Sequence, residues 1–119
     1  MKTVLALSTA IGFFALTAVA NAGCAFYDKA GWKGAKIGLQ AKECALLGTM
    51  KSDFCKGFKV VTFKGWNDRI VSVQLHHNSK AYLAQHENNT GMKMEVAGKR
   101  GTGNLGKMAK HASAIRCYQ

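Results

Sequence analysis

Apolar residues in this chain never keep a helical spacing for more than two turns beyond residue 22. Short alternating or apolar runs occur instead, separated by turn residues, and this pattern is typical of β-strands. We expect one short helix at residues 41–47, and strands at residues 24–28, 35–40, 58–63, 70–76, 81–85, 92–96 and 113–118. About eight short strands, with 13 glycines and no proline in the chain, are typical of a sandwich or small barrel. The sequence therefore predicts an all-β fold.

The first 22 residues are interpreted as a secretory signal peptide. Lys2 gives a positive start, residues 4–20 form an apolar run, and Ala20-Asn21-Ala22 matches an A-x-A cleavage site. The run is short for a membrane span, which needs about 20 residues. Gly23-Cys24 resembles the end of a lipobox, but Asn21 stands where an aliphatic residue is required. We expect cleavage after Ala22, no remaining transmembrane anchor, and a secreted or periplasmic protein.

Four cysteines follow the expected cleavage site: Cys24, Cys44, Cys55 and Cys117. In an oxidising compartment they are expected to form two disulfides, for which three connectivities are open. We favour Cys44 with Cys55, which closes a small loop, and Cys24 with Cys117, which ties the two ends together. In the chain-entropy model the first bond stabilises the fold by about 3 kcal/mol and the second by about 5 kcal/mol.

Residues 23–119 are long enough for one domain, and this domain shows signs of an internal duplication. A hairpin region leads to the segment WNDRIVSVQL, which ends the first unit at about residues 24–76. After a turn, the second unit at about residues 77–119 repeats the order with HENNTGMKMEV, a Gly-rich loop and KHASAIRCY. Neither unit is expected to bury its sheet face alone.

Two segments of the first unit carry a family resemblance. Tyr27 and Trp32 are followed by Gly34 in the pattern aromatic-x4-aromatic-x-Gly, and residues 67–72 have the sequence NDRIVS, ending in Ser72. These segments resemble the folded hairpin and the D/N-D/N-x-x-S/T-S segment of the βγ-crystallins. The resemblance implies a Greek-key β-sandwich of about eight short strands. In it, Gly34 takes a positive φ, the hairpin folds back over its own sheet, and Ser72 can bond to the hairpin backbone.

The second unit departs from the family pattern. Ala84 and Asn89 stand where the two aromatic residues are expected, although Gly91 is in place. At the far end, residues 109–114 keep Ser113 but lack the acidic or amide positions and the closing serine. The second hairpin is therefore predicted from Gly91 and the spacing of the unit rather than from a complete signature.

The resemblance also raises calcium as a cofactor, with Asn67, Asp68 and Ser113 as weak, degenerate candidate ligands. The ion requires six to eight oxygen ligands. In this family each site takes a hydroxyl from the fifth position of the closing segment, and Val71 occupies that position in the first unit. In the second unit Ser113 is in place, but Lys110 puts a cation where an anionic ligand is needed. We therefore predict structural remnants and no cofactor.

The remaining motifs do not predict an enzyme or a metal site. Residues 101–106 match G-x-G-x-x-G, but the short run that follows leaves no room for the helix of a dinucleotide site, so a flexible connection is expected. No Ser-His-Asp arrangement or pair of catalytic carboxylates is recognisable. The four histidines lack metal-ligand spacing and are expected to be surface imidazoles: His76, His77, His86 and His111.

The main functional hypothesis is based on the net positive charge of the chain. Removing residues 1–22 takes the formal net charge from +11 to +10 on 97 residues. A field of this sign favours anionic partners. Thirteen of the sixteen remaining basic residues are dispersed lysines, which lack the bidentate fork of arginine, so specific nucleic-acid recognition is not predicted. We expect an exported, non-enzymatic structural or binding protein that interacts with an anionic envelope component or extracellular polymer.

One alternative function stays open at the sequence level, namely a secreted peptidase inhibitor or a small antimicrobial, toxin-like protein. The first unit carries an insert around residues 46–57, which lies largely between Cys44 and Cys55 and has Lys51 near its middle. This insert is the candidate protease-facing element.

Overall fold

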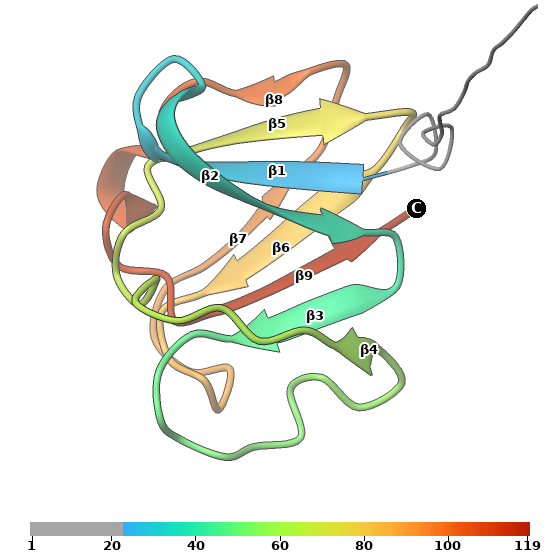
Figure 1. Ribbon diagram of the computed structural model, residues 1–119, viewed down its shortest axis with the longest axis vertical. Helices are drawn as coiled ribbons and strands as arrows, with labels where there is room; N and C mark the ends of the chain where they lie inside the picture. The colour runs from blue at the N-terminus through green and yellow to red at the C-terminus, as the bar shows by residue number, and fades with distance from the viewer. Residues whose placement is uncertain (1–22) are drawn as a thin grey trace, which may run out of the picture.

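The computed structural model describes residues 23–119, so the expected signal peptide lies outside the described residues. Within this range the chain forms nine strands and one short 3₁₀ helix at Gly106–Met108 (Figure 1). The strands are β1 (Gly23–Lys29), β2 (Lys33–Gln40), β3 (Glu43–Leu46), β4 (Lys59–Val60), β5 (Ser72–His76), β6 (Lys80–Ala84), β7 (Lys93–Val96), β8 (Gly101–Thr102) and β9 (Ala114–Tyr118). No helix in residues 23–119 is long and apolar enough to cross a membrane.

The strands form two sheets, and each sheet includes strands from both halves of the chain. The four-stranded sheet has the order β2-β1-β5-β8, and the five-stranded sheet has the order β4-β3-β9-β6-β7 (Figure 1). Strand β3 therefore follows β1 and β2 in the chain but pairs with β9, while β8 follows β6 and β7 but pairs with β5. The predicted all-β Greek-key sandwich is confirmed, with β3 and β4 in the sheet of β6, β7 and β9, and β8 in the sheet of β1, β2 and β5.

The main core lies between the sheets and draws on both repeats. Phe26 and Val73 reach it from the first sheet, and Leu83 and Ile115 reach it from the second; all four are fully buried. A smaller cluster on the opposite face of the second sheet contains Phe54 together with Cys44, Cys55, Ala84 and Ala114. Because strand residues alternate between faces, β3 contributes Ala45 to the main core and Cys44 to the smaller cluster.

The favoured disulfide pairing is confirmed. Cys24 on β1 bonds to Cys117 on β9, with their Cα atoms 5.9 Å apart, and this bond joins the two sheets within the main core. Cys44 bonds to Cys55 with a Cα–Cα distance of 5.5 Å, and this bond fixes the insert against the smaller cluster. Two disulfides fit a protein that folds in an oxidising compartment.

Three expectations about local structure are wrong. Residues 41–47 contain strand β3 rather than a helix, because pairing with β9 buries both faces of the segment. Only Lys59–Val60 of the expected strand at residues 58–63 is regular, and it pairs in parallel with β3. The Gly-rich stretch at residues 101–106 is more than a flexible connection, since it begins with β8, which pairs with β5.

Candidate functional site: the two hairpins and the insert loop

The first hairpin connects β1 to β2 and turns on left-handed backbone. Trp32 has a φ of 59° and Gly34 has a φ of 82°. The backbone N–H of Ala35 donates to Asp28 Oδ1 at 2.9 Å, which draws the Asp28 side chain against Gly34. A Cβ at position 34 would lie only 2.2 Å from Asp28 Oδ1, so glycine is required for the conformation and for space.

Trp32 and Ser72 fasten this hairpin to its sheet. Ser72 is fully buried; its Oγ accepts from the Trp32 N–H at 3.1 Å and donates to the Lys29 carbonyl at 2.7 Å. The Trp32 indole Nε1–H lies 2.9 Å from the Val73 carbonyl and 3.1 Å from that of Thr102, so one ring is bonded to both β5 and β8. The serine thus contacts the hairpin backbone in the manner that the sequence predicts.

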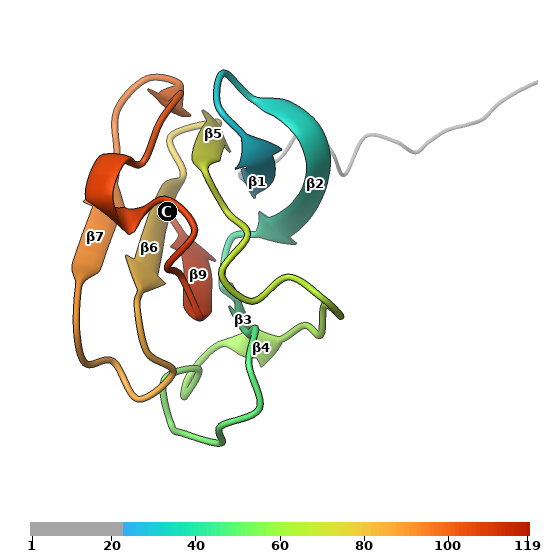
Figure 2. The same cartoon turned by 90° about the vertical axis from the view of Figure 1, so that its left-hand side faces the viewer.

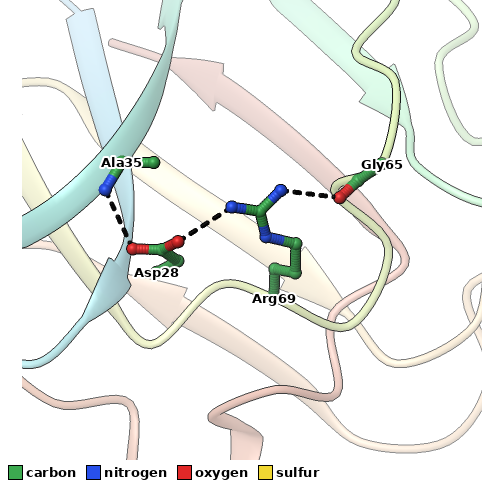
Figure 3. Close-up of polar contacts among 4 residues, drawn as sticks. All are labelled: Asp28, Ala35, Gly65 and Arg69. Carbon is green, nitrogen blue, oxygen red and sulfur yellow. Dashed lines mark hydrogen bonds and ion pairs between the residues drawn. The ribbon is translucent and has the colours of Figure 1, made fainter.

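Arg69 and Asp28 add an ion pair to the same hairpin (Figure 3). Arg69 Nη2 lies 2.8 Å from Asp28 Oδ2, and Arg69 Nη1 donates to the Gly65 carbonyl at 2.9 Å. The guanidinium also lies 4.4 Å from the centroid of the Trp66 ring. The hydrogen bond from Arg69 lowers the pKa of the Asp28 carboxyl below its ordinary value, with help from the Ala35 N–H. Sequence reasoning missed this pair because its members lie 41 residues apart.

The second hairpin, between β6 and β7, repeats two of the three left-handed positions of the first hairpin with different side chains. Asn89 has a φ of 64° and Gly91 a φ of 78°. The Met92 N–H donates to Gln85 Oε1 at 2.9 Å, as the Ala35 N–H does to Asp28 in the first hairpin. Asn89 Oδ1 accepts a hydrogen bond of 2.8 Å from the Tyr82 hydroxyl. The hairpin therefore forms without the two aromatic residues of the family pattern.

Glu87 lies at the tip of this second hairpin and is only 5% exposed. Its carboxylate accepts the Gly48 N–H at 2.9 Å and the Met50 N–H at 2.7 Å. The Ser52 hydroxyl donates to the Glu87 backbone carbonyl, and the Phe54 N–H donates to Ser52 Oγ at 3.2 Å. We define the insert loop as residues 47–58, and its N-terminal half is thus fixed by one buried acid. Figure 2 shows this loop beside the β6–β7 connection at one end of the molecule.

Arg116 holds the other side of the insert loop. It projects from β9 on the outer face of the second sheet, and its guanidinium carbon lies 4.7 Å from the Phe54 ring centroid and 4.5 Å from that of Tyr82. Phe58 lies over the same group at 5.4 Å. Arg116 Nη1 also donates to the Phe54 carbonyl at 3.2 Å. Stacked Phe54 and Tyr82 rings complete a cluster that orders the loop.

Comparison with known proteins identifies the fold. By sequence, no protein-family model and no curated protein matches the chain. By structure, the chain is similar to the N-terminal domain of Protein S, with a TM-score of 0.60 and 20% identity over 82% of this chain and 96% of that one. It has the βγ-crystallin fold.

Two further βγ-crystallin domains are similar to a comparable extent. One, from Clostridium beijerinckii, has a TM-score of 0.56 at 20% identity over 81% of this chain and 97% of that one. The other belongs to Abundant Perithecial Protein from Neurospora crassa in its Ca²⁺-bound form, with a TM-score of 0.58 at 19% identity over 82% of this chain and 89% of that one. Identities at this level concern the fold alone.

The candidate calcium ligands Asn67, Asp68 and Ser113 belong to the two closing segments of the chain. The two closing segments lie side by side, since the Asp68 N–H donates to the Ala112 carbonyl at 3.1 Å next to Ser113. Asn67 and Asp68 are exposed, and the one side-chain bond between them is long, at 3.5 Å. Among residues 23–119, no group of three or more Asp, Glu, His or Cys side chains is placed to hold a metal ion.

The other residues singled out from the sequence do not form a metal-binding group within residues 23–119. Tyr27 is buried, and its hydroxyl donates to Gln74 Oε1 at 3.1 Å across β1 and β5. The end of the Gly-rich stretch buries Leu105 beneath the 3₁₀ helix rather than cradling a phosphate. All four histidines are exposed: His76, His77, His86 and His111.

Proposed function

We propose that this protein is a non-enzymatic binding protein, active outside the cytoplasm, whose cationic surface binds an anionic polymer or lipid surface. The observation that carries the proposal is the exposure of the lysines. All thirteen lysines in residues 23–119 are exposed to solvent. Their ammonium groups therefore remain available to an anionic partner, and their mutual repulsion is relieved when that partner binds.

The carboxylates reinforce this asymmetry because several of them are engaged within the protein. Glu87 is buried against the insert loop and Asp28 is paired with Arg69. Glu95 accepts a hydrogen bond from the Tyr118 hydroxyl, and Glu43 Oε1 accepts one of 2.7 Å from the Gln40 N–H. The burial of Glu87 leaves the solvent-facing surface more cationic than the composition alone indicates. The same engagements leave few carboxylates for acid–base catalysis, which supports a binding role over an enzymatic one.

A shallow groove beside β7 supports the proposal and is the surface that we propose for binding. Its volume is about 330 Å³ and its lining combines four apolar residues with two lysines: Met92, Met94, Leu105, Met108, Lys93 and Lys107. Apolar contact in the groove, together with two ammonium groups, suits a partner that carries both hydrocarbon and negative charge. Anionic lipid is therefore the first partner to test.

The test is a vesicle-binding titration at several salt concentrations. We expect binding to phosphatidylglycerol vesicles at low ionic strength, a steady loss of affinity as salt rises, and no binding to neutral phosphatidylcholine vesicles. Lys93→Glu with Lys107→Glu should weaken binding more than Lys33→Glu with Lys36→Glu, a matched double change on β2. Absence of binding to anionic vesicles and to anionic wall polymer at low salt would contradict the proposal.

We also propose that calcium is not needed for this function. The candidate ligands support this view because they supply few anionic oxygens. Asp68 is the one carboxylate beside Asn67, and the segment opposite carries the cationic Lys110. Addition of millimolar calcium should leave the melting temperature and vesicle binding unchanged. A calcium-dependent rise in melting temperature would contradict this part.

A second candidate function is peptidase binding by the insert loop. This candidate is favoured because the loop is both exposed to solvent and held in place. Met50 is 48% exposed, and its backbone N–H is bonded to the buried Glu87. An exposed loop that is already ordered loses little conformational entropy when it binds. Incubation with a panel of secreted peptidases is the test, and unaltered rates for every peptidase would reject this candidate.

A further inference from the structure

We infer that the insert loop is a substrate-like ligand for a serine peptidase that cleaves after lysine, and that it presents the Lys51–Ser52 peptide bond. Lys51 is the residue assigned to the specificity pocket of the peptidase. This inference rests on the second candidate function, and it names the class of peptidase and the residues that contact it.

The segment around Lys51 has the form that a peptidase cleft accepts. Residues 50–52 lie outside any helix, strand or turn, and no residue of this segment has left-handed backbone. Lys51 is exposed, and Met50 beside it is one of the two large hydrophobic residues with the greatest exposure in the described range. The loop forms one end of the molecule, away from β8 and the first hairpin (Figure 1). An extended segment at one end of the molecule can enter the active-site cleft of a peptidase without a clash between the rest of this protein and the peptidase.

Glu87 holds the chain on both sides of the Lys51–Ser52 bond. On the N-terminal side its carboxylate accepts the N–H groups of Gly48 and Met50. On the C-terminal side its backbone carbonyl accepts the Ser52 hydroxyl. The residue assigned to the pocket is therefore the one lysine that lies between two positions bonded to Glu87, Met50 and Ser52.

These anchors decide what happens after a peptidase attacks. The serine oxygen of the peptidase forms an ester with the Lys51 carbonyl carbon, and the Ser52 amine leaves with a proton. In an ordinary substrate the amine diffuses away and water hydrolyses the ester. Here Ser52 remains held by Glu87, and the Cys44–Cys55 bond joins the two sides of the cut. The amine therefore stays beside the ester, attacks it, restores the peptide bond and releases the serine, so the peptidase remains occupied.

The insert loop contains a second lysine, Lys56, in its C-terminal part, which is held by other hydrogen bonds. Lys56 lies in the turn after Cys55, where its N–H donates to the Asp53 carbonyl at 2.9 Å. The Phe54 carbonyl is held by Arg116 at 3.2 Å. Only Lys51 is placed between anchors in an open segment. An ammonium at that position requires a pocket with a buried carboxylate, as in trypsin.

The experiment measures inhibition of trypsin, chymotrypsin and elastase by the oxidised protein of residues 23–119. We expect inhibition of trypsin alone. Lys51→Asp should raise the inhibition constant for trypsin by about a thousandfold, because this contact is the centre of the interface. Lys56→Ala, the matched control in the same loop, should leave the constant unchanged. Lys51→Phe should transfer inhibition from trypsin to chymotrypsin.

A second readout tests the anchors. Glu87→Gln and Ser52→Ala should convert the protein from a slowly cleaved inhibitor into a rapidly cleaved substrate, with the cut at Lys51–Ser52 identified by mass spectrometry. Circular dichroism and the melting temperature establish that each variant is folded. Inhibition that survives Lys51→Asp overturns the assignment of Lys51 but leaves peptidase binding standing. Unaltered rates for all three peptidases, or rapid cleavage of the unsubstituted loop, overturn the inference.

Discussion

The two hairpins share two left-handed backbone positions but are stabilised by different side chains. Trp32 at 59° corresponds to Asn89 at 64°, and Gly34 at 82° to Gly91 at 78°, whereas Gly31 at 72° has no left-handed counterpart in the second hairpin. In the first hairpin a tryptophan and a buried serine supply the bonds to the sheet, whereas in the second a short amide bonds to a tyrosine. The difference teaches that the fold conserves the turn geometry, and that the covering aromatics can be replaced.

The hairpin tips differ in the same way where they meet the other repeat. At the first tip, the Gly31 N–H donates to the Gly103 carbonyl at 2.8 Å, a single backbone contact with the loop after β8. At the second tip, Glu87 bonds to three residues of the loop after β3. Each tip is therefore held by the loop that follows the exchanged strand, and the longer insert loop makes the more extensive contact.

The largest expected difference between the hairpins concerns Trp32 and Asn89. Trp32→Ala removes a partly buried ring and two indole contacts and should lower the free energy of unfolding by about 3 kcal/mol. Asn89→Ala removes one hydrogen bond and should lower it by about 1 kcal/mol. Urea denaturation of both variants measures the difference. Equal losses would show that the second hairpin depends on Asn89 as strongly as the first depends on its aromatic residue.

The glycines should behave alike, because both hairpins need the same turn. Gly34→Ala and Gly91→Ala each place a Cβ on left-handed backbone and should each lower the free energy of unfolding by about 2 kcal/mol. At position 91 the new Cβ would lie 2.5 Å from Gln85 Oε1.

Gly38→Ala on β2 is the control for these glycines, since its Cβ would meet only the Cys24 carbonyl at an ordinary 3.8 Å. Its effect on urea denaturation should be smaller than that of either hairpin change. A large loss at Gly34 with none at Gly91 would mean that the second turn can rearrange.

The smallest expected difference between the two hairpins is in how their stability responds to low pH. The pKa of Asp28 in the folded protein lies below its ordinary value of 3.8, so its stabilising effect is complete above about pH 4 and is lost as the pH falls through the folded pKa. Asp28→Asn should therefore lower the melting temperature at pH 6 and have little effect at pH 2. Gln85, its counterpart, does not titrate, so Gln85→Ala should have the same effect at both pH values. A pH-independent effect of Asp28→Asn would exclude the ion pair as its cause.

Local signals in the sequence were sufficient for the first hairpin. Tyr27, Trp32 and Gly34 predict the folded hairpin because their spacing is short and their chemistry is specific. The helix expected over residues 41–47 is wrong because Cys44 and Ala45 have weak intrinsic preferences, which pairing with Arg116 and Ile115 overrides. Strand β8 was missed because its two residues lie among glycines and become regular only by pairing with β5.

The contacts that define the candidate site were harder to predict, because they join residues far apart in the chain. Glu87 lies 37 residues from Met50, and no pattern in either segment points to the other. The sequence did offer one signal that could have been used: Asp28 and Gln85 each place a side-chain oxygen seven residues before the N–H that it accepts. Both hairpins therefore have a side-chain oxygen seven residues before the N–H group that it accepts. This spacing identifies the second hairpin even though its two aromatic residues are missing.

The exchange of β3 and β8 has a consequence for the origin and assembly of this chain. A protein with only one such repeat would lack the third strand of its own sheet and would find it only on a second copy, so its folding would depend on concentration. Joining the two repeats in one polypeptide supplies that partner at a fixed, high local concentration. Once joined, each half is free to lose residues that the other still provides, as the unequal hairpins illustrate.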